Sequence, residues 1–254
     1  MSTFGGQIAA LTGSGLLNTF GDNPLVSVLF GGNDLFAALD DPTFDAAALA
    51  RGLGDGIRAI ADLGEEYDSF VVSSVGDLTA APSFGEASRL AALATGDPEV
   101  IAAQQALAAR AQQISLAYQT ELELEIARLV DEGLDITFFD QAQIFADGLR
   151  DGSLSFAESI FPCTPQMSAP DLVNNCAVLG FDESGAPIVD ISVADNFLWV
   201  DGVHPSQAVH QFLAAELRAV LGDRVPAPVP LPAGLPLLLL GIGALVLIRR
   251  RGLF

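Results

Sequence analysis

The sequence predicts an α/β domain, and three observations lead to this prediction. Short apolar runs of strand length alternate with longer stretches in which apolar residues recur at helical spacing. Residues 1–221 show no internal repeat and are numerous enough to bury a real hydrophobic core. Residues 222–233 are rich in proline and residues 234–254 are largely apolar. We therefore expect one domain over residues 1–221, then a linker and a terminal apolar segment.

The first predicted elements alternate between strand and helix. Leu25–Phe30 is expected to be a buried strand, followed by glycines that allow a sharp turn. Phe44–Leu63 shows helical spacing and ends at Gly64. Ser69–Ser74 is predicted as a second strand and Ile136–Phe139 as a third.

A long helical pattern lies between the last two strands. Asp97 is a capping residue with Pro98 at the first helical position, and the pattern continues to about Glu132. An unbroken helix of this length would extend about 52 Å at 1.5 Å per residue, more than a small domain needs. We therefore expect a break near Ser115–Tyr118. Farther along, Gly152–Asn196 is polar and interrupted by prolines, which predicts a long irregular loop region.

A carboxylate and an imidazole lie three residues apart at Asp201 and His204, one of the two histidines in the chain. A histidine can accept and return a proton near neutral pH, and a neighbouring carboxylate can fix its tautomer. The pair precedes an amphipathic helix that Pro205 and Ser206 open and that ends near Leu221. His210 lies on that helix and is expected to be a packing or surface residue rather than a second catalytic group.

A second motif directly follows the first predicted strand, at Gly31-Gly32-Asn33-Asp34. Glycines at a strand end let a ligand approach the backbone closely, and an Asn amide there can donate to a developing oxyanion. Together, the two motifs resemble the blocks of the SGNH/GDSL family of serine esterases and lipases: Gly31–Asp34 matches Gly-x-Asn-Asp, and Asp201–His204 matches Asp-x-x-His. The resemblance implies that Asp201 and His204 are catalytic and that Asn33 and Gly31 form the oxyanion hole.

The family's nucleophile block, Gly-Asp-Ser-Leu on its first strand, has no counterpart in this chain, so no nucleophile is assigned. The resemblance implies a three-layer sandwich around five parallel strands in the order 2-1-3-4-5. The absent first strand would lie in the middle of that sheet. We therefore expect the first strands to be missing, one edge of Leu25–Phe30 to be exposed, and the chain to be a truncated or mis-started version of a longer gene product.

The C-terminal segment resembles a sorting tail. Val229–Ala233 has the sequence Val-Pro-Leu-Pro-Ala, and an apolar stretch follows that ends in three arginines, Arg249–Arg251. This order is similar to the tails that exosortase-type sorting enzymes of Gram-negative bacteria recognise. It implies a single transmembrane helix within residues 234–254 and, because arginines favour the cytoplasmic side, an exported domain on the cell surface. Membrane and sorting enzyme are thus expected partners.

Composition limits the function classes. The formal net charge is −21 and the chain has no lysine, so its surface repels nucleic acid. His and Cys pairs at metal-ligand spacing are absent from the sequence, and we expect neither a metal nor a cofactor. Cys163 and Cys176 close a short loop, which predicts a disulfide in an exported protein, two buried thiols being the alternative.

Two function classes remain open from the sequence. The first is an exported ester hydrolase acting on lipid or other acyl esters, inactive in this chain because the serine is absent. The second is a cell-surface interaction protein that uses the esterase scaffold without catalysis. The aromatic set, 16 Phe against 2 Tyr and 1 Trp, leans toward acyl chains as substrates rather than sugars.

Overall fold

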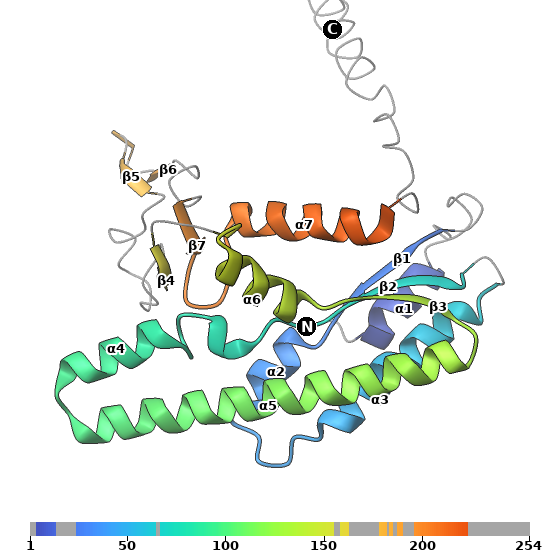
Figure 1. Cartoon of the computed structure of the whole chain (residues 1–254), viewed down its shortest axis with the longest axis horizontal. Helices are drawn as coiled ribbons and strands as arrows, with labels where there is room; N and C mark the ends of the chain where they lie inside the picture. Colours follow the sequence, from blue (N-terminus) through green and yellow to red (C-terminus); the bar gives the residue numbers. More distant parts are fainter. Residues whose placement is uncertain are drawn as a thin grey trace, which may run out of the picture. The chain divides into compact units, whose positions relative to one another are not determined.

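Figure 1 shows the computed structural model of the chain. It describes residues 4–13, 24–64, 67–154, 158–162, 178–181, 183–184, 187–189 and 196–222. The chain divides into two units, Met1–Leu217 and Arg218–Phe254, and the second is described only for residues 218–222. The predictions for the disulfide Cys163–Cys176 and the transmembrane segment 234–254 lie outside the described residues, as does all but the first residue of the linker 222–233.

Helices and strands alternate, as the sequence predicts for an α/β fold. The helices are α1 (Phe4–Gly13), α2 (Gly32–Ala38), α3 (Ala46–Ala61), η2 (Leu78–Ala80, a 3₁₀ turn), α4 (Glu86–Thr95), α5 (Pro98–Asp131), α6 (Gln141–Asp151) and α7 (Gln207–Leu221). The strands are β1 (Val26–Leu29), β2 (Ser69–Ser73), β3 (Asp135–Phe139), β4 (Glu158–Pro162), β5 (Val178–Phe181), β6 (Pro187–Val189) and β7 (Phe197–Trp199).

A parallel three-stranded sheet in the order β1-β2-β3 lies at the centre. Strand β2 is the middle one, and its residues from Phe70 to Ser73 are buried. In Figure 1, α3 and α5 lie on one side of this sheet, and α6 and α7 on the other. The carboxyl ends of parallel strands meet at one edge, so the loops after β1, β2 and β3 are brought together there.

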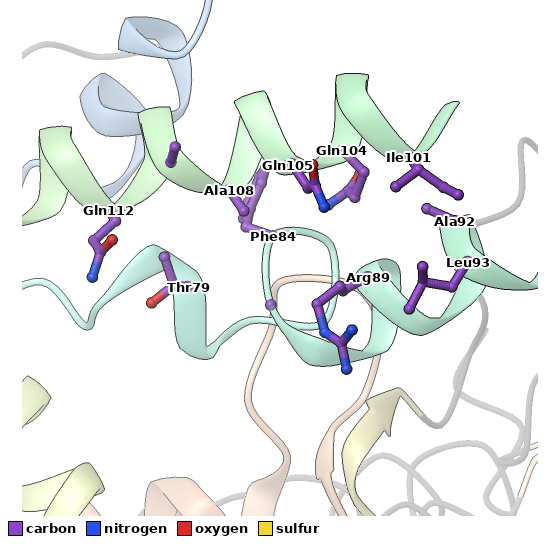
Figure 2. A pocket seen from close by; sticks show the side chains of 12 residues that line it. Thr79, Phe84, Arg89, Ala92, Leu93, Ile101, Gln104, Gln105, Ala108 and Gln112 are labelled. Carbon is purple, nitrogen blue, oxygen red and sulfur yellow. The ribbon is translucent and has the colours of Figure 1, made fainter. Parts of the chain in front are cut away.

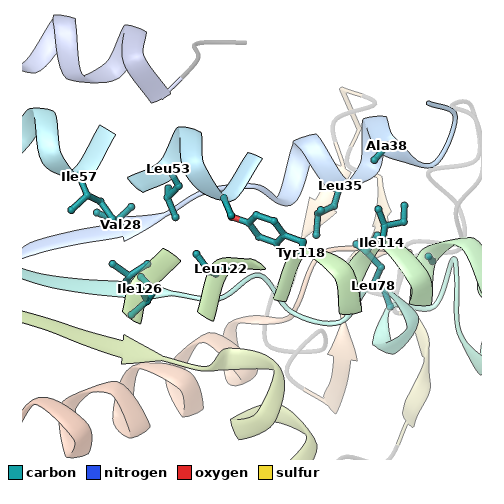
Figure 3. Close-up of a cluster of buried hydrophobic side chains, with 14 of the residues drawn as sticks. Val28, Leu35, Ala38, Leu53, Ile57, Leu78, Ile114, Tyr118, Leu122 and Ile126 are labelled. Atoms are coloured by element: carbon teal, nitrogen blue, oxygen red, sulfur yellow. The ribbon is translucent and has the colours of Figure 1, made fainter. Parts of the chain in front are cut away.

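The hydrophobic core joins the sheet to α3 and α5. Figure 3 shows how their side chains interdigitate around Tyr118, which is 2% exposed. Val28 and Phe70 enter this core from the strands, and Ile57 and Leu122 from the helices. Burial of so much apolar surface fixes the register of the strands, because a one-residue slip would turn their core side chains outward.

Strand β1 differs from the prediction of a buried strand. Val28 is 3% exposed, but Leu29 is 57% exposed and Ser27 is also exposed. Of the strands that the structure describes, β2 alone pairs with β1, so β1 lies at an edge of the sheet. The apolar composition of Leu25–Phe30 is typical of an interior strand, whereas its position here is that of an edge strand.

Helix α5 is continuous from Pro98 to Asp131, so the predicted break near Ser115–Tyr118 is wrong. The helix begins where expected, because Asp97 accepts a hydrogen bond from the NH of Glu99 at 2.8 Å. Its first half extends past the sheet, where α4 and the η2 turn pack against it. Ser115 is buried, and its Oγ accepts a hydrogen bond from the NH of Leu78 at 3.2 Å. The residue at the expected break therefore lies within the helix and contacts the η2 turn.

The region 152–196 contains more regular structure than the predicted irregular loop. Strand β4 pairs in parallel with β7, and β5 pairs antiparallel with β6. The apolar run Phe197–Trp199 forms β7, and the ring of Trp199 lies 5.7 Å from that of Phe145 on α6. This packing anchors the segment that leads into Asp201 and His204.

Candidate active site

Asp201 and His204 form the hydrogen-bonded pair that the sequence predicts. The Nδ1 atom of His204 lies 2.7 Å from Oδ2 of Asp201. A carboxylate at this distance holds the proton on Nδ1 and leaves Nε2 as the acceptor. The imidazole itself is exposed, with 74% of its side chain accessible, so Nε2 can reach a ligand.

The loop that carries this pair is held by main-chain hydrogen bonds. Oδ1 of Asp201 accepts the NH of Val203 at 2.8 Å and the NH of His204 at 2.7 Å. The NH of Val200 donates to the carbonyl of His204 at 2.8 Å, which closes the loop on itself. One side chain therefore both shapes the turn and orients the imidazole, as an Asx turn does.

The charge state of Asp201 suits this role. Partial burial raises the pKa of Asp201, but the hydrogen bonds from Val203 NH, the His204 ring and His204 NH together lower the pKa below its usual value. The carboxylate is thus ionised at neutral pH. An ionised carboxylate beside the ring stabilises the imidazolium that forms when His204 accepts a proton.

A second loop ties the Asp201–His204 loop to the body of the domain. The NH of Ser83 donates to the carbonyl of Gly202 at 3.0 Å, and Gly202 lies between Asp201 and His204 in the chain. The amide of Gln104 on α5 donates in turn to the carbonyl of Ser83 at 3.3 Å. The segment after η2 therefore positions the Asp201–His204 loop against α5.

Gly31 follows β1 in a conformation that requires glycine. Its φ is +109°, and a Cβ built on it would lie 2.8 Å from Oη of Tyr118. That phenol donates to the carbonyl of Phe30 at 3.3 Å. Burial, followed by the charge of Asp34, raises the pKa of Tyr118 to about 12, so the phenol stays a donor at neutral pH. Tyr118 therefore shapes the backbone at the predicted oxyanion site.

Asn33 lies in the first turn of α2, with an exposed side chain. Asn33, Gly31 and His204 line one cleft of about 950 Å³. Residues from α1, α3 and the end of β2 line the same cleft. The structure thus brings together the three site residues from two distant motifs, and Asp201 supports His204 from outside the cleft lining. The cleft combines a proton acceptor with amide donors, the two groups that acyl transfer needs.

Several residues of this cleft were not singled out by the sequence, among them Tyr118 and Ser74. Tyr118 and Ser74 both line it but belong to no recognisable local motif. His210, expected to be a packing or surface residue, lines it as well. It lies on α7, which begins at Gln207, whereas His204 precedes that helix.

Ser74 is the one serine among the described residues that line the cleft. It is fully buried, and its hydroxyl donates to Oδ1 of Asp140 at 3.1 Å. The NH of Ala142 donates to the same hydroxyl at 3.4 Å. These contacts join β2 to the start of α6, so Ser74 serves structure and does not present a nucleophile to a ligand.

No protein-family model matches this chain, and no curated protein matches it. The functional assignment therefore rests on the geometry of the cleft. Within the described ranges, no three His, Cys, Asp or Glu side chains gather closely enough to hold a metal ion. In the same part of the chain, no helix has the length and hydrophobicity needed to cross a bilayer.

Proposed function

We propose that the chain is the main part of an SGNH/GDSL-type ester hydrolase, a three-layer sandwich whose nucleophile comes from a strand beside β1. One observation carries the proposal: His204, held by Asp201, lines the same cleft as Asn33 and Gly31. A paired imidazole and an amide donor at a glycine turn suit acyl transfer, in which one group moves a proton and the other binds an oxyanion.

The edge of β1 supports a strand-borne nucleophile. Among the described strands β1 pairs with β2 alone, and Leu29 on it is 57% exposed. A parallel strand added there would cover this apolar edge and would end beside Gly31, at the carboxyl edge of the sheet. A serine at the end of such a strand would face the cleft that His204 lines.

The residues then have the following roles. The serine hydroxyl attacks the acyl carbonyl while Nε2 of His204 takes its proton, and Asp201 stabilises the imidazolium. The amide of Asn33 and the backbone NH of Gly31 donate to the oxyanion. His204 returns the proton to the leaving alkoxide, which departs as the alcohol. Water, deprotonated by His204, then hydrolyses the acyl-serine to the carboxylic acid and free serine.

The test restores the reading frame upstream of the Met1 codon. The longer protein should hydrolyse p-nitrophenyl butyrate, retain activity in EDTA and react with a fluorophosphonate probe at an upstream serine. The His204→Ala variant of the same protein should lose turnover. Activity that EDTA abolishes, or turnover that survives His204→Ala, would contradict the mechanism.

A second candidate is a non-catalytic interaction protein on the same scaffold. It is favoured by the burial of Ser74, the serine that the structure places in the described cleft lining. An in-frame stop codon just upstream of Met1, with no esterase activity in the isolated chain, would favour this candidate over the hydrolase.

We also propose, from the Val229–Ala233 motif and Arg249–Arg251, that the protein is exported and anchored at the cell surface of a Gram-negative bacterium. The full-length protein should fractionate with the envelope and be accessible to external protease. Replacing Arg249–Arg251 by serines should disturb this location, whereas an unchanged distribution would argue against a sorting role.

A further inference from the structure

A second cavity of about 390 Å³ lies beside the catalytic loop, away from the residues proposed for chemistry. Figure 2 shows it between α4, the first half of α5 and the segment from Thr79 to Gly85. Much of its lining is aliphatic or aromatic: Phe84, Ala92, Leu93, Ile101 and Ala108. Such a cavity suits an apolar ligand, because burying a hydrocarbon there removes its surface from water.

This cavity and the active-site cleft adjoin at a pair of aromatic rings. Phe36 lines the cleft and Phe84 lines the cavity, and their ring centroids are 5.9 Å apart. Phe84 also directly follows Ser83, whose NH donates to Gly202 in the catalytic loop. A substrate whose carbonyl lies near Asn33 and His204 would therefore have its remaining length close to the cavity.

The charges around the cavity argue against a phosphate or other anionic headgroup as the occupant. Arg89 is the one basic side chain of its lining. Its guanidinium pairs with Glu86 in the same helix, with Nε donating to Oε2 at 2.6 Å. The nearest cation is thus already neutralised, and the other polar lining groups are uncharged amides and a hydroxyl.

The floor of the cavity is fixed rather than open to rearrangement. The amide of Gln104 donates to the carbonyl of Ser83 and, at 2.7 Å, to Oγ of Ser88. A Cβ on Gly85 would lie 2.3 Å from the carbonyl oxygen of Thr79, so the turn at this position is too tight for any side chain. A cavity held in this way can bind a chain without a large cost of ordering its walls.

We propose that this cavity binds the aliphatic acyl chain of the ester substrate, which would leave the cleft beside Phe36 and enter the cavity beside Phe84. That the bound chain belongs to a substrate rests on the proposed function, but binding of an aliphatic chain does not itself require catalysis. The substrate class is then aliphatic acyl esters rather than acetylated sugars.

Binding of the uncharged methyl ester of cis-parinaric acid to the full chain, followed by its fluorescence and by displacement with methyl decanoate, tests the proposal without turnover. Ala108→Phe should fill the cavity and weaken binding at least tenfold. Ala106→Phe is the matched control, because Ala106 is exposed on the same helix and does not line the cavity; it should bind as the wild type does. Circular dichroism and thermal melting establish that each variant folds.

A second variant guards against misfolding of the first. Leu93 is 44% exposed at the cavity, so Leu93→Glu should preserve the fold and still weaken binding by placing a charge there. Equal binding by the wild type, Ala108→Phe and Leu93→Glu, or no binding by the wild type, would overturn the proposal. Chain binding without esterase activity in the restored protein would refute the proposed function and leave this inference standing.

Discussion

The phenol of Tyr118 packs directly against the backbone of Gly31, 2.8 Å from where a Cβ of residue 31 would lie. Helix α5 thereby sets the shape of the loop that follows β1 in sequence. The contact links the longest helix of the domain to the loop that carries the candidate oxyanion donors.

The Gly31→Ala substitution should destabilise the domain by about 1–3 kcal/mol, because residue 31 has a positive φ and the new methyl meets Tyr118. Urea denaturation measures this loss. Gly32→Ala is the control: its Cβ would meet only Val75, at 3.9 Å. Adding Tyr118→Phe to Gly31→Ala should recover part of the loss, and no recovery at all would show that φ strain alone is responsible.

Glu125 should be the main electrostatic contact between α3 and α5. Its side chain is 3% exposed, and it pairs with Arg58 at 2.9 Å and Arg128 at 2.7 Å. Glu125→Gln should lower the free energy of unfolding by about 1–3 kcal/mol, because the guanidinium groups of Arg58 and Arg128 lose their buried counter-charge. Glu132→Gln, at the exposed end of the same network, should have little effect. Equal effects of the two variants would contradict this assignment.

Neutral His204 should carry its proton on Nδ1. Oδ2 of Asp201 accepts at 2.7 Å from that nitrogen and therefore favours this tautomer. Long-range ¹H–¹⁵N spectra of the His210→Gln variant, which keeps a single histidine, report the tautomer directly. Asp201→Asn should shift the population toward the Nε2–H form. A wild-type spectrum already dominated by Nε2–H would refute the proposed orientation.

The stability that ionised Asp201 confers should depend on pH in a defined direction. Folding lowers its pKa, so the contribution is complete above the ordinary pKa of an aspartate and is lost as pH falls through the lower folded value. The difference in unfolding free energy between wild type and Asp201→Asn should thus shrink as the pH falls below the ordinary pKa of an aspartate. A difference that widens over that acid range would have the wrong sign.

In the protein with its upstream sequence restored, Asn33→Ala should reduce kcat by about 10²–10³-fold with little change in KM, as expected for loss of one oxyanion donor. Stopped assays with p-nitrophenyl butyrate give both constants. His210→Gln is the control from the same cleft and should retain activity. An effect of Asn33→Ala on KM alone would assign the amide to ground-state binding.

Patterns among neighbouring residues predicted most helices and strands, whereas contacts between residues distant in sequence determined where those predictions failed. The cap at Asp97 and Pro98 defined the start of α5 because capping depends on adjacent residues alone. The predicted break at Ser115 was wrong because its buried contact comes from Leu78, in a distant segment. The apolar composition of Leu25–Phe30 predicted burial and did not reveal the exposure of Leu29, whereas the absent first strand of the resemblance did predict the exposed edge.

In the candidate site, too, local spacing was predictive and contacts between distant residues were not. Asp201 and His204 could be paired from their spacing, whereas the shared cleft of His204 and His210 depends on where α7 begins. Tyr118 could not have been found from sequence, because its partner Phe30 belongs to another element and the contact leaves no periodic pattern.

The link between Ser83 and Gly202 joins two main-chain atoms. A substitution at either position leaves donor and acceptor in place, except that proline at position 83 would remove the donor. The residue types at these two positions therefore do not determine this hydrogen bond, and it is the course of the backbone that holds the Asp201–His204 loop in place.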